Sequence, residues 1–291
     1  MKQERVDRLI DILPDFDELD PVFDHILATS RPDPGRTWSA SGEVGTVGAR
    51  LVDTESLEAA TDEMAERARE HLAGLYRNVA RVARALERGE REAAARILVE
   101  IAELEEDADR VDRAEAYALA AVEVARELRD RRPVALALRR AGRAARARGR
   151  LESALERYRE AWEIGRVVGP VRDAAEAAIG AGNVLEQQGG WKEAEAWYRR
   201  ALDRMDDYEH PAPERWHAAL NIHICLRSRG ELETSVAWLE QAEEAARKAQ
   251  DSAAIPYLGS ARGQLRIAEG DAHGAERWYR RALAETDHAV A

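Results

Sequence analysis

The sequence contains little cysteine, few aromatic residues and no long apolar run. Its single cysteine, Cys225, excludes a disulfide within the chain and favours a reducing compartment. Aromatic residues make up 5% of the 291 residues, which disfavours a β-sandwich built on bulky strand residues. The sequence contains no run of about 18 apolar residues, so no membrane span is predicted. Residues 1–20 lack the apolar segment of a signal peptide. We therefore expect a cytoplasmic protein.

The residues that are abundant favour helices. Hydrophobic residues make up 45% of the chain and charged residues 34%, which is the composition of a folded protein. Alanine, the strongest helix former, recurs throughout. The formal net charge is -12, which disfavours nucleic acid as the main partner. We predict an all-α protein.

The chain repeats itself at a nearly constant period. The string WYRRAL occurs at 197–202 and again at 278–283, two periods later. Glycines recur in register with it, once in each period, and they predict turns: Gly149, Gly189, Gly230 and Gly270. Four helix–turn–helix units therefore align on these glycines.

Small and aromatic residues recur at fixed places in these units. The first helix of each unit carries a small residue, with a histidine in one unit: Gly142, Gly182, His223 and Gly263. The second helix carries a small residue, then an aromatic or leucine, then alanine: Ala154, Tyr158 and Ala161; Ala194, Tyr198 and Ala201; Ser235, Leu239 and Ala242; Ala275, Tyr279 and Ala282. Small residues let two helices approach closely while the larger side chain fills the space beside them.

This pattern resembles the tetratricopeptide repeat, in its long-helix variety. The resemblance implies a right-handed α-solenoid of stacked antiparallel helix pairs, whose first helices line a concave surface that binds a peptide or protein segment. Four repeats are predicted over 132–291. Residues 56–131 are predicted to form N-terminal helices that include a divergent first repeat, in which Asp109 replaces the turn glycine. Residues 1–55 are predicted to be an acidic segment with short helices and a Pro/Gly/Ser linker.

The stretch RRPVALALRRAGRAARARGR, residues 131–150, holds eight arginines and no acid. On a helix, Arg139, Arg143, Arg146 and Arg150 fall together to one side of the apolar face, towards the predicted groove. Residues at matching places in later repeats extend this surface with amides and a further arginine. The predicted partner-binding residues are Arg139, Arg143, Arg146, Asn183, Asn221, Arg227 and Gln264.

Two interpretations of the arginines remain open. Arginine forks bind carboxylates, so an extended acidic peptide would suit the groove, and the acidic segment 15–20 of the chain itself is one candidate occupant. Alternatively, Arg139, Arg143, Arg146 and Arg150 are solvated, or are neutralised by acids of the next helix: Glu152, Glu156, Glu160 and Glu163.

No catalytic, cofactor-binding or metal-binding pattern is found. His217 and His223 are six residues apart and would lie on different faces of a helix, and Cys225 has no evident base beside it. We expect a non-enzymatic scaffold; the alternatives are a peptide-sensing regulator that acts through a protein partner and, less favoured, a nucleic-acid-binding helical repeat. Trp197, Trp238 and Trp278 are predicted to pack between second helices. The C-terminal helix has no polar cap, which suggests either a homodimer or partner contact there or a natural chain that continues beyond Ala291.

Overall fold

The computed structural model describes residues 74–75, 77–79, 81–206 and 214–289. The chain divides into two compact units, Met1–Glu90 and Arg91–Ala291. Of the first unit, residues 74–75, 77–79 and 81–87 are described and are helical. The predictions for the acidic segment 1–55, including residues 15–20 as an occupant of the groove, lie outside the described residues.

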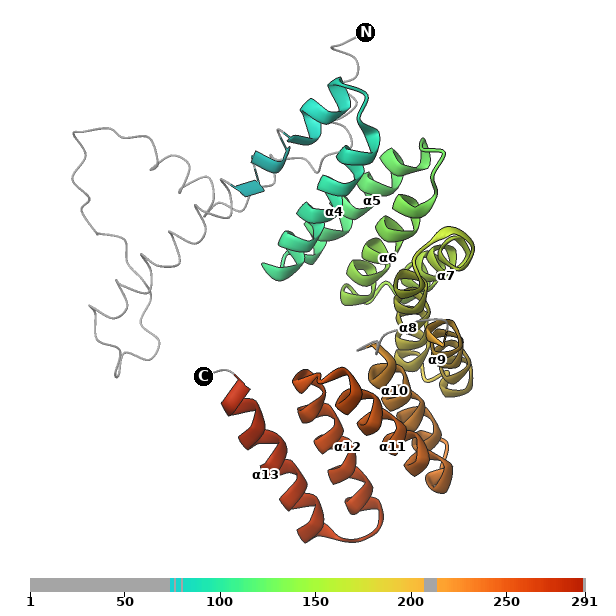
Figure 1. The fold of residues 1–291 in the computed structure, drawn as a ribbon, viewed down its shortest axis with the longest axis vertical. Coiled ribbons are helices and arrows are strands. Elements are labelled where there is room, and N and C mark those ends of the chain that lie inside the picture. The colour runs from blue at the N-terminus through green and yellow to red at the C-terminus, as the bar shows by residue number, and fades with distance from the viewer. Residues whose placement is uncertain (1–73, 76, 80, 207–213, 290–291) are drawn as a thin grey trace, which may run out of the picture. The chain divides into compact units, whose positions relative to one another are not determined.

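In its described residues the second unit consists of helices and the short connections between them (Figure 1). Its elements are α4 (Arg91–Asp107), α5 (Val111–Arg126), α6 (Arg132–Ala147), α7 (Leu151–Val168), α8 (Val171–Gln187), α9 (Trp191–Met205), α10 (Glu214–Ser228), α11 (Leu232–Ala249), the 3-10 helix η2 (Ser252–Ala254), α12 (Ile255–Ala268) and α13 (Ala272–Ala289). None of the described helices is long and apolar enough to cross a membrane.

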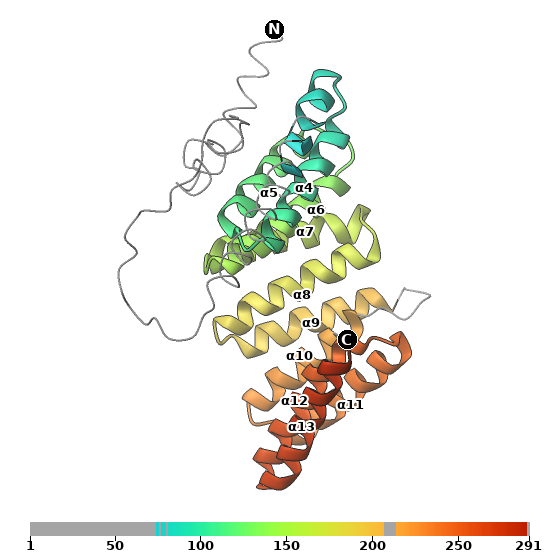
Figure 2. The ribbon, with the colours of Figure 1, turned by 90° about the vertical axis from the view of Figure 1, so that its left-hand side faces the viewer.

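Consecutive helices pack as pairs, and the pairs follow one another along the unit (Figure 2). The pairs are α4/α5, α6/α7, α8/α9, α10/α11 and α12/α13. The turn glycines inside the last four pairs have φ between +72° and +83°, a conformation that favours glycine. At the first of these turns Gly149 N–H donates to Arg146 O at 3.0 Å and Arg150 N–H donates to Ala145 O at 2.9 Å, which ends α6 with paired carbonyls. The predicted all-α solenoid of helix pairs is confirmed.

The α4/α5 pair forms a fifth repeat of the same design. Asp109 has a φ of 58° at its turn, the place that glycine occupies in the other pairs. The same two turn bonds form, from Asp109 N–H to Glu106 O at 2.9 Å and from Arg110 N–H to Glu105 O at 2.8 Å. The divergent repeat therefore closes like the others, although its turn residue carries a side chain.

Replacing Asp109 with glycine is expected to stabilise the protein by about 1 kcal/mol, because glycine removes the steric cost of a left-handed residue. The reverse change at the matching turn, Gly149→Asp, should destabilise by a similar amount. Urea unfolding followed by circular dichroism measures both. A loss of stability in Asp109→Gly would show that the Asp109 side chain makes a contact that outweighs its backbone cost.

Tyrosines of the second helices are packed against glycines of the first helices. Tyr198 is fully buried, and a Cβ added at Gly182 would lie 2.5 Å from its ring. In the α10/α11 pair the sizes are exchanged, since His223 takes the glycine position and Leu239 the tyrosine position, and both are fully buried. His223 accordingly marks altered helix packing, as predicted, and its Nδ1 lies 2.9 Å from Ser235 O.

The first helices of the pairs make up what we call the inner layer: α4, α6, α8, α10 and α12. Along this layer α4 contacts α6, α6 contacts α8 and α8 contacts α10, whereas the backbones of the second helices stand further apart. Second helices meet through long side chains, as where the Trp162 and Trp197 rings pack edge to face at 6.0 Å. Trp197 thus packs between second helices as predicted. Closer spacing on one side bends a stack towards that side, so the inner layer is the concave one.

Candidate functional site

Helix α6 carries the arginines and presents them from the inner layer. Pro133 lies in its first turn, and Asp130 accepts a hydrogen bond from the Arg132 N–H at 2.9 Å just before it. Its apolar face is buried, with Val134 and Leu138 among the core residues. The helix ends at Ala147, so Arg150 lies beyond the turn, immediately before α7. Its grouping with the other three arginines on one helix face was therefore wrong.

Most of the α6 arginines are paired with acids of the two neighbouring first helices. Arg139 pairs with Asp173, at 3.5 Å, and with Glu176, both on α8. On the other side, α4 supplies the partners of the next two arginines: Arg140 pairs with Glu103, and Arg143 pairs with Glu106. The arginine stripe therefore lies between two acidic stripes, and much of its charge is compensated within the protein.

The acids of α7 are not the ones that neutralise the stripe. Glu160 pairs with Arg126 of α5 at 3.3 Å, and Glu163 pairs with Arg166 of its own helix at 2.5 Å. One of the interpretations left open, an internal network of ion pairs, is found for Arg139, Arg140 and Arg143, but its acids come from neighbouring first helices rather than from the following second helix. The reason is that first helices contact one another across repeats, which brings their polar faces into register.

Arg146 differs from its neighbours on α6. Among the described residues it has no ion pair with an acid, whereas its buried Nε without a hydrogen-bond partner is a feature it shares with Arg139 and Arg140. Its charge acts on the Tyr158 hydroxyl: burial raises the pKa of Tyr158, and the Arg146 charge opposes that rise. It also acts on His217, whose pKa is lowered first by burial and then by Arg146. Arg146 therefore lies where α6, α8 and α10 come together.

A short hydrogen-bond chain links α8, α9 and α10 beside Arg146. The Tyr198 hydroxyl lies 2.8 Å from Asn183 Oδ1 and 2.8 Å from Glu186 Oε2. The Asn221 amide donates to Asn183 Oδ1 at 3.1 Å. One hydroxyl hydrogen cannot serve two acceptors, so the direction of the chain depends on whether Glu186 is protonated. Burial raises the pKa of Glu186, which makes this carboxyl the group that selects the direction.

The structure separates the seven predicted binding residues into three groups. Asn183 and Asn221 are brought together, but their amides are engaged in the chain, and Asn221 is only 7% exposed. Arg139 and Arg143 are held by acids. The remaining three have no acid partner among the described residues: Arg146, Arg227 and Gln264. Gln264 is exposed on α12.

The sequence analysis missed several residues of this surface. Glu106 occupies the same place in its repeat as Arg146, one repeat before it, and reading the repeat register for acids would have found it. Glu186, one repeat after Arg146, was visible in that register as the acid between Arg146 and Arg227, but it was assigned no role. His217 and Tyr158 gave no such signal, because only helix packing brings the ends of their side chains beside Arg146.

The pH dependence of stability should carry the signature of His217. Its pKa in the folded protein is lowered, by burial and then by Arg146, while Glu214 opposes the shift. The unfolded chain therefore binds more protons just below about pH 6.5, so stability is expected to fall as the pH falls through that value. Arg146→Gln should raise the pKa of His217, measured by histidine NMR titration. An unchanged pKa in this variant would place the guanidinium away from the ring.

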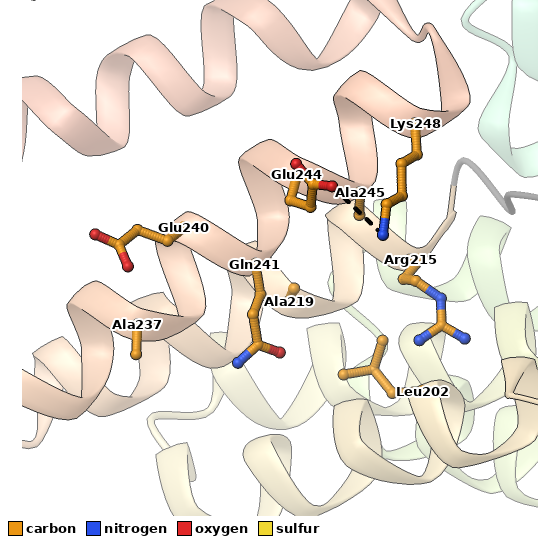
Figure 3. Close-up of a pocket in the computed structure, with 9 residues that line it drawn as sticks. All are labelled: Leu202, Arg215, Ala219, Ala237, Glu240, Gln241, Glu244, Ala245 and Lys248. Carbon is orange, nitrogen blue, oxygen red and sulfur yellow. Dashed lines mark ion pairs between the residues drawn. The ribbon is translucent and has the colours of Figure 1, made fainter.

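A groove is lined by residues of α9, α10 and α11 (Figure 3). Its volume is about 520 Å³, and it is lined by Leu202, Arg215, Ala219, Ala237, Glu240, Gln241, Glu244, Ala245 and Lys248. Leu202 takes the position that Trp162 fills one repeat earlier, and the smaller side chain leaves this space. Lys248 and Glu244, one turn apart on α11, pair along its rim at 3.4 Å. The rim carries both signs of charge, so it selects no particular ligand charge.

The chemistry of the remaining candidate residues is structural. Cys225 is fully buried, and burial raises the pKa of its thiol to about 12, so it stays protonated at neutral pH. In the part of the chain that is described, no cluster of three or more His, Cys, Asp or Glu side chains is arranged to hold a metal ion.

A leucine of the last helix is exposed, although the leucine at the matching place of an earlier repeat is buried. Leu283 of α13 is 67% exposed, whereas Leu202 at the matching place of α9 is 9% exposed beneath α10. The homodimer or partner contact at this helix stays a prediction.

Comparison with known proteins agrees with this architecture. Residues 93–166 match the family model of the tetratricopeptide repeat, which covers the divergent first repeat and the one after it. No curated protein gives a significant match.

Solved structures share the fold at low identity. BtubC (BKLC) from P. vanneervenii has a TM-score of 0.65 and 20% identity, over 76% of this chain and 91% of that chain. The apo form of RapI has a TM-score of 0.55 and 12% identity, over 77% and 94%. A Rap protein complexed with competence and sporulation factor has a TM-score of 0.52 and 16% identity, over 68% and 65%.

Proposed function

Because the chain carries tetratricopeptide repeats, we propose that it is a non-enzymatic scaffold that binds an extended peptide or protein segment against the inner layer. The surface offers donors and acceptors along several helices instead of a single enclosed cavity, which suits a segment that runs across repeats. The solved Rap complex with competence and sporulation factor supports a ligand of this kind on the same fold.

The proposal rests on the surroundings of the Arg146 side chain. Its neighbours on α6 are paired with acids, while Arg146 has no acid partner in the described residues and lies beside the hydrogen-bonding groups of three helices. A guanidinium in that position can receive a carboxylate without first breaking an internal ion pair. An acidic ligand is therefore proposed, with Arg146 as its main contact and Arg139 and Arg143 as parts of the protein's own network.

The proposal predicts that one arginine matters more than its neighbours. Affinity capture from lysate, after nuclease treatment, would compare the wild type with Arg146→Glu, with Arg166→Glu on an outer helix as the matched control. Partners kept by wild type and control but lost by Arg146→Glu would support the proposal. Equal capture by all three would contradict it, and partners lost on nuclease treatment would indicate nucleic acid instead. Substituting Arg139 or Arg143 is less informative, because a new acid there would face Glu176 or Glu106.

A further inference from the structure

The last turns of the first helices present a row of alternating charge. Residues at the same place in four successive repeats are Glu106, Arg146, Glu186 and Arg227. Glu106 is held by Arg143. The other three have no ion pair with a neighbouring side chain in the described parts of the chain, so three consecutive repeats present positive, negative and positive groups.

Each of the three groups is placed by the helix that carries it. Arg146 and Arg227 both have a buried Nε with no hydrogen-bond partner, while neither side chain is fully buried. Arg227 lies close enough to His223 for its charge to lower the pKa of that ring, after the larger effect of burial. Glu186 is fixed by the Tyr198 hydroxyl at 2.8 Å. Glu186 is therefore positioned before any ligand binds, and the two arginine side chains are partly buried.

We infer that this row of charged side chains selects the bound segment by its charge pattern. This inference rests on the function proposed above. The segment would place one acidic residue at Arg146, a basic residue at Glu186 and a second acidic residue at Arg227. Packed helices lie about 8–10 Å apart, and an extended chain advances about 3.3 Å per residue. Neighbouring contacts are thus about three residues apart, and the pattern is acid-x-x-base-x-x-acid.

Alternation distinguishes this ligand from a simply acidic one. A uniformly acidic segment would place a carboxylate against Glu186, and like charges brought together in a partly buried site are strongly unfavourable. Net charge alone would therefore not predict affinity for this protein. Glu186 would be the specificity-determining residue, while Arg146 and Arg227 would supply attraction.

A random peptide display library, selected on the immobilised full-length protein, tests the inference. The wild type should enrich acid-x-x-base-x-x-acid about tenfold over the same residues at other spacings. Glu186→Arg should select an acid at the central place, Glu186→Gln should lose the central preference, and Arg227→Gln should lose one outer acid. Arg166→Gln, on the outer side of α7, is the matched control and should select the wild-type pattern. Circular dichroism confirms the fold of each variant.

Three outcomes overturn the inference. If the wild type and both Glu186 variants enrich peptides with the same central residue, Glu186 does not select the charge of that residue. This outcome overturns the inferred charge pattern but leaves the proposed peptide binding intact. Peptides enriched equally by wild type and Arg146→Glu place binding away from this row. No enrichment above uncoated beads overturns the proposed function as well.

A second readout locates the ligand's first acid. A synthetic peptide with the enriched pattern should raise the pKa of His217, because the bound carboxylate offsets the nearby charge of Arg146. Histidine NMR titration with and without the peptide measures this shift. A bound peptide that leaves the pKa of His217 unchanged contradicts contact with Arg146.

Discussion

Glu115→Gln is expected to lower the free energy of unfolding by about 3 kcal/mol, because it leaves several partly buried cations without their anion. Glu115 lies on α5 and is 1% exposed. Its carboxylate contacts Arg148 at 2.7 Å, Arg150 at 3.2 Å and Arg157 at 2.7 Å. These arginines belong to the following repeat, so this one carboxylate joins two repeats.

The effect should depend on pH in a defined direction. Burial alone would raise the pKa of Glu115, but hydrogen bonds from Arg157 and Arg148 outweigh it, and the pKa lies below 4.5. The stabilisation is therefore present above about pH 4.5 and is lost as the pH falls through the folded pKa. Wild type and variant should converge in acid, which urea unfolding at several pH values measures.

Asp112→Asn provides the matched control. Asp112 pairs with the same Arg148, at 2.5 Å, but its side chain is 76% exposed. Exposed pairs contribute about 0–1 kcal/mol, so the control should change stability little. Equal losses in both variants would mean that burial of Glu115 adds nothing to its ion pairs.

Gly182→Ala should destabilise by about 3 kcal/mol, although alanine is the better helix former by about 1 kcal/mol. The added Cβ would lie 2.5 Å from the ring of Tyr198, which is fully buried and cannot move away. Thermal and urea unfolding measure the loss. Gly74→Ala is the control, because nothing lies within 4 Å of the added Cβ and helix propensity alone should act.

A double-mutant cycle separates the steric cause from other effects. Tyr198→Leu copies the leucine that stands at this place in the α10/α11 pair, where His223 fills the space instead. In the Tyr198→Leu background, Gly182→Ala should cost far less than in the wild type. An equal cost in both backgrounds would contradict the packing of this glycine against the tyrosine ring.

The architecture was predictable because its signals are local and repeated. A glycine is needed wherever the turn takes a positive φ, and a small residue is needed wherever a tyrosine packs, so both recur at the period of the fold. Asp109 shows the limit of this reading, since its turn closes in the same way without glycine. His223 and Leu239 were visible in the sequence as exceptions to the glycine and tyrosine pattern. In the structure the larger His223 and the smaller Leu239 fill the same buried space between the two helices.

The binding surface was predictable only in part. The arginines of α6 were placed on the inner layer correctly, but which of them are paired depends on acids of the neighbouring repeats, on α4 and α8. A helical wheel describes one helix, and it contains no information on which neighbouring side chains reach across to it. Asn183 and Asn221 were identified as groove residues, whereas their mutual hydrogen bond follows from the contact of α8 with α10.

The sequence by itself determined the helix pairs, their period and the solenoid, because turn chemistry and small-residue packing are properties of short segments that repeat. Only the tertiary structure decided that Arg139, Arg140 and Arg143 are neutralised while Arg146 lacks an acid partner among the described residues. Charge pairing acts over a few ångströms in space, and side chains from separate repeats come that close only after the first helices have stacked.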